Sequence, residues 1–152
     1  MGYNYSRLKK DLILIFMMGA LYMVLEGLWG GWTHISMLVV GGISAFLIGK
    51  LNEHPTFYNR KMWEQCIIGT IIILVLEFIG GVILNIWLKL DIWDYSREPF
   101  NLYGQICLFY ALIWFLLVPF NIYVDDYLRY RLFGEKKPEG LFQNYKDLFT
   151  LQ

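Results

Sequence analysis

Two glutamates, Glu26 and Glu77, lie within runs of apolar residues that are long enough to form helices. An ionisable side chain inside a membrane span is costly and is by default a candidate for a functional site. Two carboxylates at similar depth could share a proton, bind a cation or receive a cationic ligand. The alternative is that each carboxyl group is protonated or hydrogen-bonded and only fixes helix packing. Its candidate partners would then be Tyr22, Asn85, Tyr110 and Trp114.

A polar and aromatic segment at residues 89–102 follows the second glutamate. Its carboxylate, hydroxyl and amide side chains could line an outward-facing vestibule above the two glutamates, together with His34 from an earlier turn. The alternative is that Asp94 and Ser96 cap a short helix, while the aromatic residues form a belt at the membrane interface. The candidate ligand- or ion-binding residues are therefore Glu26, His34, Glu77, Asn85, Asp94, Tyr95, Ser96 and Asn101.

Metal binding and catalysis have little support in the sequence. His34 and His54 are the only histidines, and we expect them on opposite sides of a bilayer, which excludes a histidine-rich metal site. The sequence contains no nucleophile elbow, HExxH motif or phosphate-binding loop. We therefore predict no catalytic residue, metal or cofactor, and no ATP-hydrolysing machinery in this chain.

The composition indicates an all-α membrane protein. The 152 residues are 57% hydrophobic, and the apolar residues gather in runs with almost no charge. Balanced totals of 13 basic and 13 acidic residues give no overall field to attract nucleic acid. We predict a transmembrane domain at residues 1–133 and a cytoplasmic tail at 134–152. The four predicted transmembrane helices cover residues 12–29, 35–49, 66–88 and 103–124, followed by a surface helix at 125–133.

The distribution of basic residues predicts the orientation. Of the 13 Lys and Arg residues, 11 lie in the N-terminal segment, in the loop at 50–64 or after residue 124. By the positive-inside rule, both termini are then cytoplasmic and the segment at 89–102 faces outward. This predicts a multi-pass membrane protein with cytoplasmic termini.

A short internal repeat relates the two halves of the chain. The sequence Val-Leu-Glu followed by Gly-Gly occurs at residues 24–31 and again at 75–81, with one residue fewer between the two parts. Both glutamates would lie on spans that run outward, so the copies would form a parallel two-helix repeat. Each glutamate would lie between the midplane and the outer face, on a stripe of small or polar residues.

The second half of the chain resembles a known family. The residues that carry the resemblance are Glu77, Gly80, the run at 93–96 (WDYS), Pro99, Asn101 and Gly104. Over about residues 75–114 the chain resembles the small bacterial ABC-transporter permeases of the CmpB-like, type IV family. The resemblance implies a permease that works with a separate ATPase, and it implies importance for Glu77, Asp94, Tyr95, Ser96 and Asn101. Residues 32–49 depart from the family pattern, which has a glycine-rich, proline-containing stretch there.

The leading prediction is a small permease-like subunit or binding module with an outward-facing polar site around an intramembrane glutamate. Four short spans enclose little volume, so a solute path would form between copies of the chain or with a partner membrane subunit, among membrane lipids. One alternative is a non-transporting scaffold or sensor whose tail recruits a cytoplasmic partner. Another is a lipid-modifying enzyme that uses the neighbourhood of Glu77, Asp94 and His34.

Overall fold

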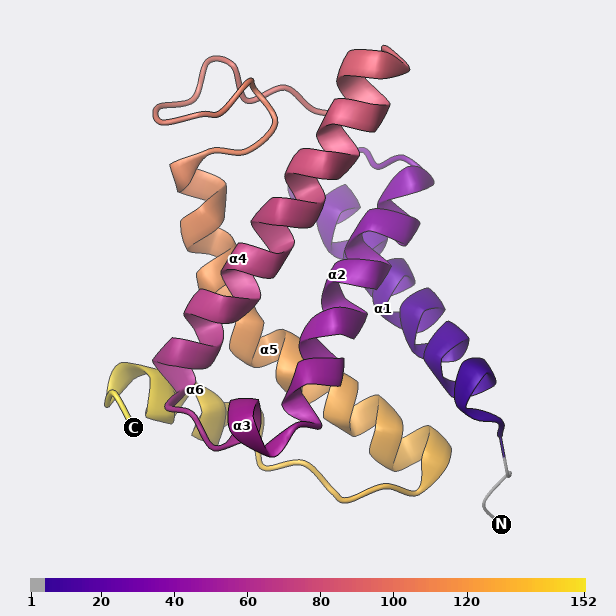
Figure 1. The fold of residues 1–152 in the computed structure, drawn as a ribbon, viewed down its shortest axis with the longest axis vertical. Helices are drawn as coiled ribbons and strands as arrows, with labels where there is room; N and C mark the ends of the chain where they lie inside the picture. The colour runs from indigo at the N-terminus through magenta and orange to yellow at the C-terminus, as the bar shows by residue number, and fades with distance from the viewer. Residues whose placement is uncertain (1–4) are drawn as a thin grey trace.

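The computed structural model describes residues 5–152, and this part of the chain is built from helices (Figure 1). Its only extended pairing is a single antiparallel bridge between Leu102 and Ile106. The elements in order are α1 (Arg7–Gly30), α2 (Ser36–Asn52), α3 (Pro55–Tyr58), α4 (Met62–Gly81), the π-helix η1 (Val82–Trp87), α5 (Leu108–Phe133) and α6 (Leu141–Phe149).

Three of the helical segments are long and apolar enough to cross a membrane: α1, the continuous pair α4–η1, and α5. The pair α4–η1 has 26 residues, which corresponds to about 39 Å of helix against a hydrocarbon core of about 30 Å. The fourth predicted span is α2, which is apolar but has only 17 residues. The all-α, membrane-type fold is therefore confirmed, with three full-length candidate spans and one shorter apolar helix.

Two predicted boundaries around the last span were wrong. Helix α5 begins at Leu108 and not at residue 103, because residues 103–107 complete the preceding loop and Cys107 is still extended. Helix α5 also continues without a break to Phe133, through the segment predicted as a separate surface helix. The reason is that Asp125 and Arg129 in this segment are buried and not exposed at a surface.

Glycine allows α1 and α2 to pack closely. A Cβ atom on Gly19 would meet the backbone carbonyl of Leu38, and one on Gly42 would meet that of Ile15. Two backbones can approach this closely only where neither helix carries a side chain at the contact. Helices α1 and α2 therefore form a tight hairpin.

The loop at residues 88–107 lies at one end of the molecule (Figure 1). The first turn of α1, helix α3, helix α6 and the C-terminus lie at the other end. Helix α6 is held there by side-chain bonds to α5: Asn144 Nδ2 donates to the carbonyl of Pro119 at 3.2 Å, and the Tyr145 hydroxyl donates to that of Leu116 at 2.8 Å. These bonds occupy carbonyls of the turn around Pro119, where a proline removes one helical hydrogen bond.

Candidate functional site

Glu77 lies on α4 with only 4% of its surface exposed. Its two carboxylate oxygens accept hydrogen bonds from different side chains. The Tyr95 hydroxyl donates to Oε1 at 3.3 Å, and Trp114 Nε1 donates to Oε2 at 3.1 Å. We call Glu77, Tyr95 and Trp114 the Glu77 cluster. Among the described residues 5–152, no basic side chain pairs with this carboxylate.

Tyr95 reaches Glu77 because the 88–107 loop is fixed internally. The Asp94 carboxylate accepts bonds from the backbone N–H and the hydroxyl of Ser96, at 2.8 and 2.9 Å. These bonds lower the pKa of Asp94, so its side chain is charged at neutral pH. Asn101 Nδ2 donates to the carbonyls of Ser96 and Glu98, at 3.2 and 2.9 Å. The three side chains close the loop tip, and none of these bonds reaches the Glu77 carboxylate.

The turn around Gly104 then sets the position of Tyr95. The Tyr95 N–H donates to the carbonyl of Gly104 at 2.8 Å, and the Gly104 N–H donates to Asn101 Oδ1 at 3.1 Å. Gly104 has φ +68°, and a Cβ there would come 2.9 Å from Asp94 Oδ1. Glycine is therefore favoured at this position.

The ring of Tyr95 stacks on Tyr110, with ring centroids 4.6 Å apart. Burial and the nearby Glu77 raise the pKa of the Tyr95 phenol. Because the phenol keeps its proton, it acts as a hydrogen-bond donor to the carboxylate over the physiological pH range. The loop thus adds a neutral donor above Glu77 and no compensating cation.

Asn85, one of the predicted ligand-binding residues, has hydrogen-bond partners in the loop. It lies in η1, where its Nδ2 donates to Gln105 Oε1 at 3.0 Å and its Oδ1 accepts the N–H of Ile92 at 2.7 Å. A Cβ on Gly81 would collide with Gln105, so this glycine makes room for the same contact. Asn85 and Gln105 therefore fasten the two ends of the loop to the end of α4–η1. Single π-turns inside α-helices often occur at functional sites.

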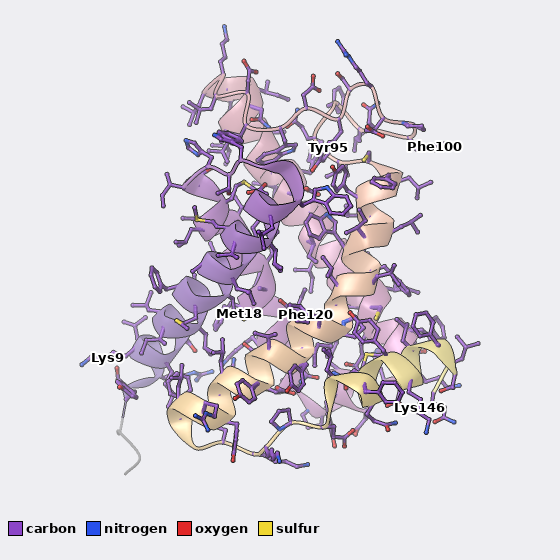
Figure 2. All side chains as sticks on the ribbon, turned by 180° about the vertical axis from the view of Figure 1, so that it is seen from behind. Lys9, Met18, Tyr95, Phe100, Phe120 and Lys146 are labelled. Carbon is purple, nitrogen blue, oxygen red and sulfur yellow. The ribbon has the colours of Figure 1, made fainter. Side chains whose placement is uncertain are left out.

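A cavity of about 80 Å³ adjoins Glu77 between α1, α2, α4 and α5. Most of its lining is apolar. The polar or aromatic side chains in the lining are Tyr22, Ser44, Glu77, Trp114, Phe120 and Asn121. The ring centroids of Tyr22 and Trp114 lie 5.8 Å apart. Figure 2 shows Met18 of α1 and Phe120 of α5, both from the cavity lining, where these two helices diverge.

Glu26 and His34 have their own partners near the start of α2. Glu26 accepts a hydrogen bond from the Thr33 hydroxyl. His34 Nδ1 accepts the N–H of Ser36 at 3.2 Å and lies 2.8 Å from its hydroxyl oxygen. The structure therefore brings Glu77 and Tyr95 together, groups Asp94, Ser96 and Asn101 at the loop tip, and gives Asn85, Glu26 and His34 separate partners.

Several residues that organise the structure were missed at the sequence level. Gln105 was not singled out, and no local pattern marks it, because its importance depends on contacts with Asn85 and the loop. A buried ion-pair cluster was also missed. Arg129 Nε donates to Asp125 Oδ2 at 2.6 Å, and its Nη1 pairs with Glu53. The spacing of four residues between Asp125 and Arg129 is the signal that could have revealed part of this cluster.

The model of one protein family, described as Putative ABC-transporter type IV, matches residues 12–139. The chain belongs to this family. The match confirms the resemblance carried by the second half and extends it over the first half, including residues 32–49, where we expected a departure from the family pattern. No curated protein and no solved structure matches the chain. Family membership and the apolar helices support a transport-related membrane protein.

Proposed function

We propose that this protein is a small permease-like subunit or binding module of the bacterial inner membrane, with its polar site at Glu77. The observation that carries the proposal is that Glu77 is buried beside a cavity and, among residues 5–152, accepts side-chain hydrogen bonds from the neutral donors Tyr95 and Trp114 and pairs with no basic side chain. A buried carboxylate without a paired cation is costly to maintain for packing alone. The cavity gives the charge access to a ligand.

We also propose the topology and the partners. The 88–107 loop faces outward and closes the site as a lid, while both termini and the tail at 134–152 are cytoplasmic, in accordance with the positive-inside rule. The membrane domain at 1–133 has α2 as its fourth, shorter span. A separate ATPase supplies the energy, and another copy of the chain or a partner membrane subunit completes the solute path, because four spans enclose little volume.

Uptake of a panel of radiolabelled small solutes by expressing cells tests the function. We expect at least one solute to be taken up by the wild type and not by Glu77→Gln at matched membrane abundance. Glu64→Gln makes the same substitution in the first turn of α4, outside the Glu77 cluster and the cavity lining, and should retain uptake. Equal uptake by Glu77→Gln and the wild type would remove the carboxylate from the mechanism.

Cysteine labelling from outside the cell tests the topology. Cys66 and Cys107 are both buried, so the native background should be low. We expect a membrane-impermeant maleimide to label Arg97→Cys in the exposed loop and not Asn59→Cys in the exposed segment after α3. The reverse pattern would overturn the orientation.

The scaffold or sensor alternative draws support from α6, whose Phe142 and Phe149 are 83% and 72% exposed. Purification of the full chain from native membranes separates the two proposals, since an associated ATPase supports the permease and a soluble signalling protein bound through α6 supports the sensor. The lipid-modifying alternative requires Glu77, Asp94 and His34 to converge. The lining of the cavity beside Glu77 includes neither Asp94 nor His34, so the cavity offers this alternative no support.

A further inference from the structure

The chemistry around Glu77 defines the class of ligand that could occupy the cavity. A carboxylate without a paired cation attracts a positive charge, and aromatic rings stabilise an organic cation through their π faces. Here Tyr22 and Trp114 line the cavity beside Glu77. Tyr95 and Trp114 already donate to the carboxylate, which leaves room for a cationic donor on the cavity side. A neutral donor would gain only a hydrogen bond from Glu77, and an anionic ligand would be repelled.

The rest of the cavity defines the shape and polarity of that ligand. Its wall away from Glu77 is formed mainly by apolar side chains such as Met18, Leu21, Ile73 and Leu117. A volume of about 80 Å³ is about half of the roughly 150 Å³ cavity that holds a benzene molecule. The cavity therefore takes a positive head with the first carbons of a slim chain, and the rest of the chain lies outside it.

The helix arrangement provides an entrance from the side. Helix α1 packs mainly against α2 and only sparsely against α5. The cavity is not fully enclosed, and Figure 2 shows α1 and α5 diverging above Met18 and Phe120. Apolar residues of both helices line the cavity, including Leu25 of α1, which is 40% exposed. The 88–107 loop covers the Glu77 cluster at the end of the helices through Tyr95.

We infer that the site takes the ammonium head of a slim lipophilic amine, which enters sideways from the bilayer between α1 and α5 and pairs with Glu77 beside the rings of Tyr22 and Trp114, while the end of its chain extends toward the bilayer. This inference rests on the proposed role of Glu77 as the binding group. It adds the ligand class and the route, because an apolar entrance suits a molecule that is already dissolved in the membrane.

Binding to the full chain in phosphatidylcholine nanodiscs tests the ligand class. The probes are hexylamine, which is an ammonium ion at neutral pH, and 1-hexanol as its neutral counterpart, with empty nanodiscs as the blank in calorimetry. We expect hexylamine to bind at least about tenfold more tightly than 1-hexanol, which is the size of effect that a desolvated cation–aromatic and charge contact supplies. Glu77→Gln should remove that preference, and Glu64→Gln should keep it. Equal binding of both probes, or a preference unchanged in Glu77→Gln, would overturn the inference.

The route has its own test. Met18→Trp adds bulk at a buried residue of the cavity lining between α1 and α5, so it should slow hexylamine association in stopped-flow measurements, while Leu8→Trp on the exposed start of α1 should not. Cross-linking through Met17→Cys, which is 40% exposed, reports whether a second copy covers this face. An unchanged association rate in Met18→Trp, or efficient cross-linking between copies, would overturn entry from the bilayer.

These results separate the inference from the proposed function. If uptake of some solute depends on Glu77 but hexylamine does not bind, the amine class is wrong and the permease proposal stands. If hexylamine binds through Glu77 but no solute is taken up, the binding site stands and transport is wrong.

Discussion

Glu77 and Asp125 are both buried carboxylates, but they have different kinds of partner. Asp125 is 0% exposed and Glu77 is 4% exposed. Asp125 is paired with Arg129, which also contacts Glu53 at the end of α2. Glu77 has two neutral donors and an adjoining cavity. A buried charge with an ionic partner joins helices together, whereas one without an ionic partner next to a cavity is available for a ligand.

The two carboxylates also differ in how tightly they are packed. A Cβ atom on Gly49 would collide with the Asp125 carboxylate, so α2 closes directly over this side chain. The nearest glycine to Glu77 in the cavity lining is Gly41, where an added Cβ would meet the ring of Tyr22 and not the carboxylate. This contrast predicts that changes around Asp125 act mainly on stability and that changes around Glu77 act mainly on function.

The largest loss of stability should follow Arg129→Met. Removing one partner of a buried ion pair leaves the other charge uncompensated and costs about 3–5 kcal/mol. The free energy of unfolding of the full chain, from SDS titration in mixed micelles followed by circular dichroism, measures this loss. Arg131→Met on the exposed side of the same helix should cost much less. A loss below about 1 kcal/mol for Arg129→Met would show that the pair contributes no more than a surface salt bridge. The contrast between Asp125 and Glu77 would then be wrong.

A smaller loss should follow Gly49→Ala. The added methyl group meets the Asp125 carboxylate, and overpacking of this kind costs about 1–3 kcal/mol. Gly27→Ala is the matched control because a Cβ there has nothing within 4 Å, and alanine favours the helix by up to about 1 kcal/mol. The same unfolding assay applies to both variants. If the two glycine variants behaved alike, the tight closure over Asp125 would be contradicted.

Tyr95→Phe should produce a modest change in stability and a clear change at the site. It removes one hydrogen bond to Glu77 and keeps the stack on Tyr110, so the expected loss is about 1 kcal/mol. Hexylamine affinity should also change, because the carboxylate loses a donor that fixes its orientation. Tyr103→Phe, at a 77% exposed position of the same loop, provides the control and should alter neither quantity. An unchanged affinity in Tyr95→Phe would mean that the loop does not contribute to the site.

The smallest effect on stability should come from Glu77→Gln. The glutamine can accept from Trp114 and donate to the Tyr95 oxygen, so we expect a change within about 0.5 kcal/mol of the wild type. Solute uptake and the preference for hexylamine should nevertheless disappear. Asp125→Asn sharpens the comparison, because it leaves Arg129 without its buried partner and should destabilise the protein more than Glu77→Gln. The opposite ranking would show that Glu77 is the packing residue.

Parts of the site could be predicted because they depend on local sequence. Glu77 stands out as a charge in an apolar run, and Trp114 was among the hydrogen-bond partners considered for it. The WDYS run marks the loop that holds Tyr95, and Asp94 and Ser96 bond to each other over two residues. The sequence does not show which residue each of the predicted site residues bonds to. Asn85 bonds to Gln105 across 20 positions, and no periodic pattern connects two such residues.

By itself, the sequence determined that this chain forms apolar helices of membrane-spanning length and belongs to its family, because hydropathy and motif spacing are properties of contiguous residues. Only the tertiary structure decided which charges are paired. Arg129 and Glu53 are 76 positions apart, and the crossing of α2 and α5 brings them into contact. The same crossing buries Asp125, which lies in the part of α5 that continues to Phe133. From the charged and aromatic residues at 125–133 alone, we predicted a surface helix there. Whether a charged side chain is buried and paired depends on what packs against it, and the packing partners are helices that are distant in sequence.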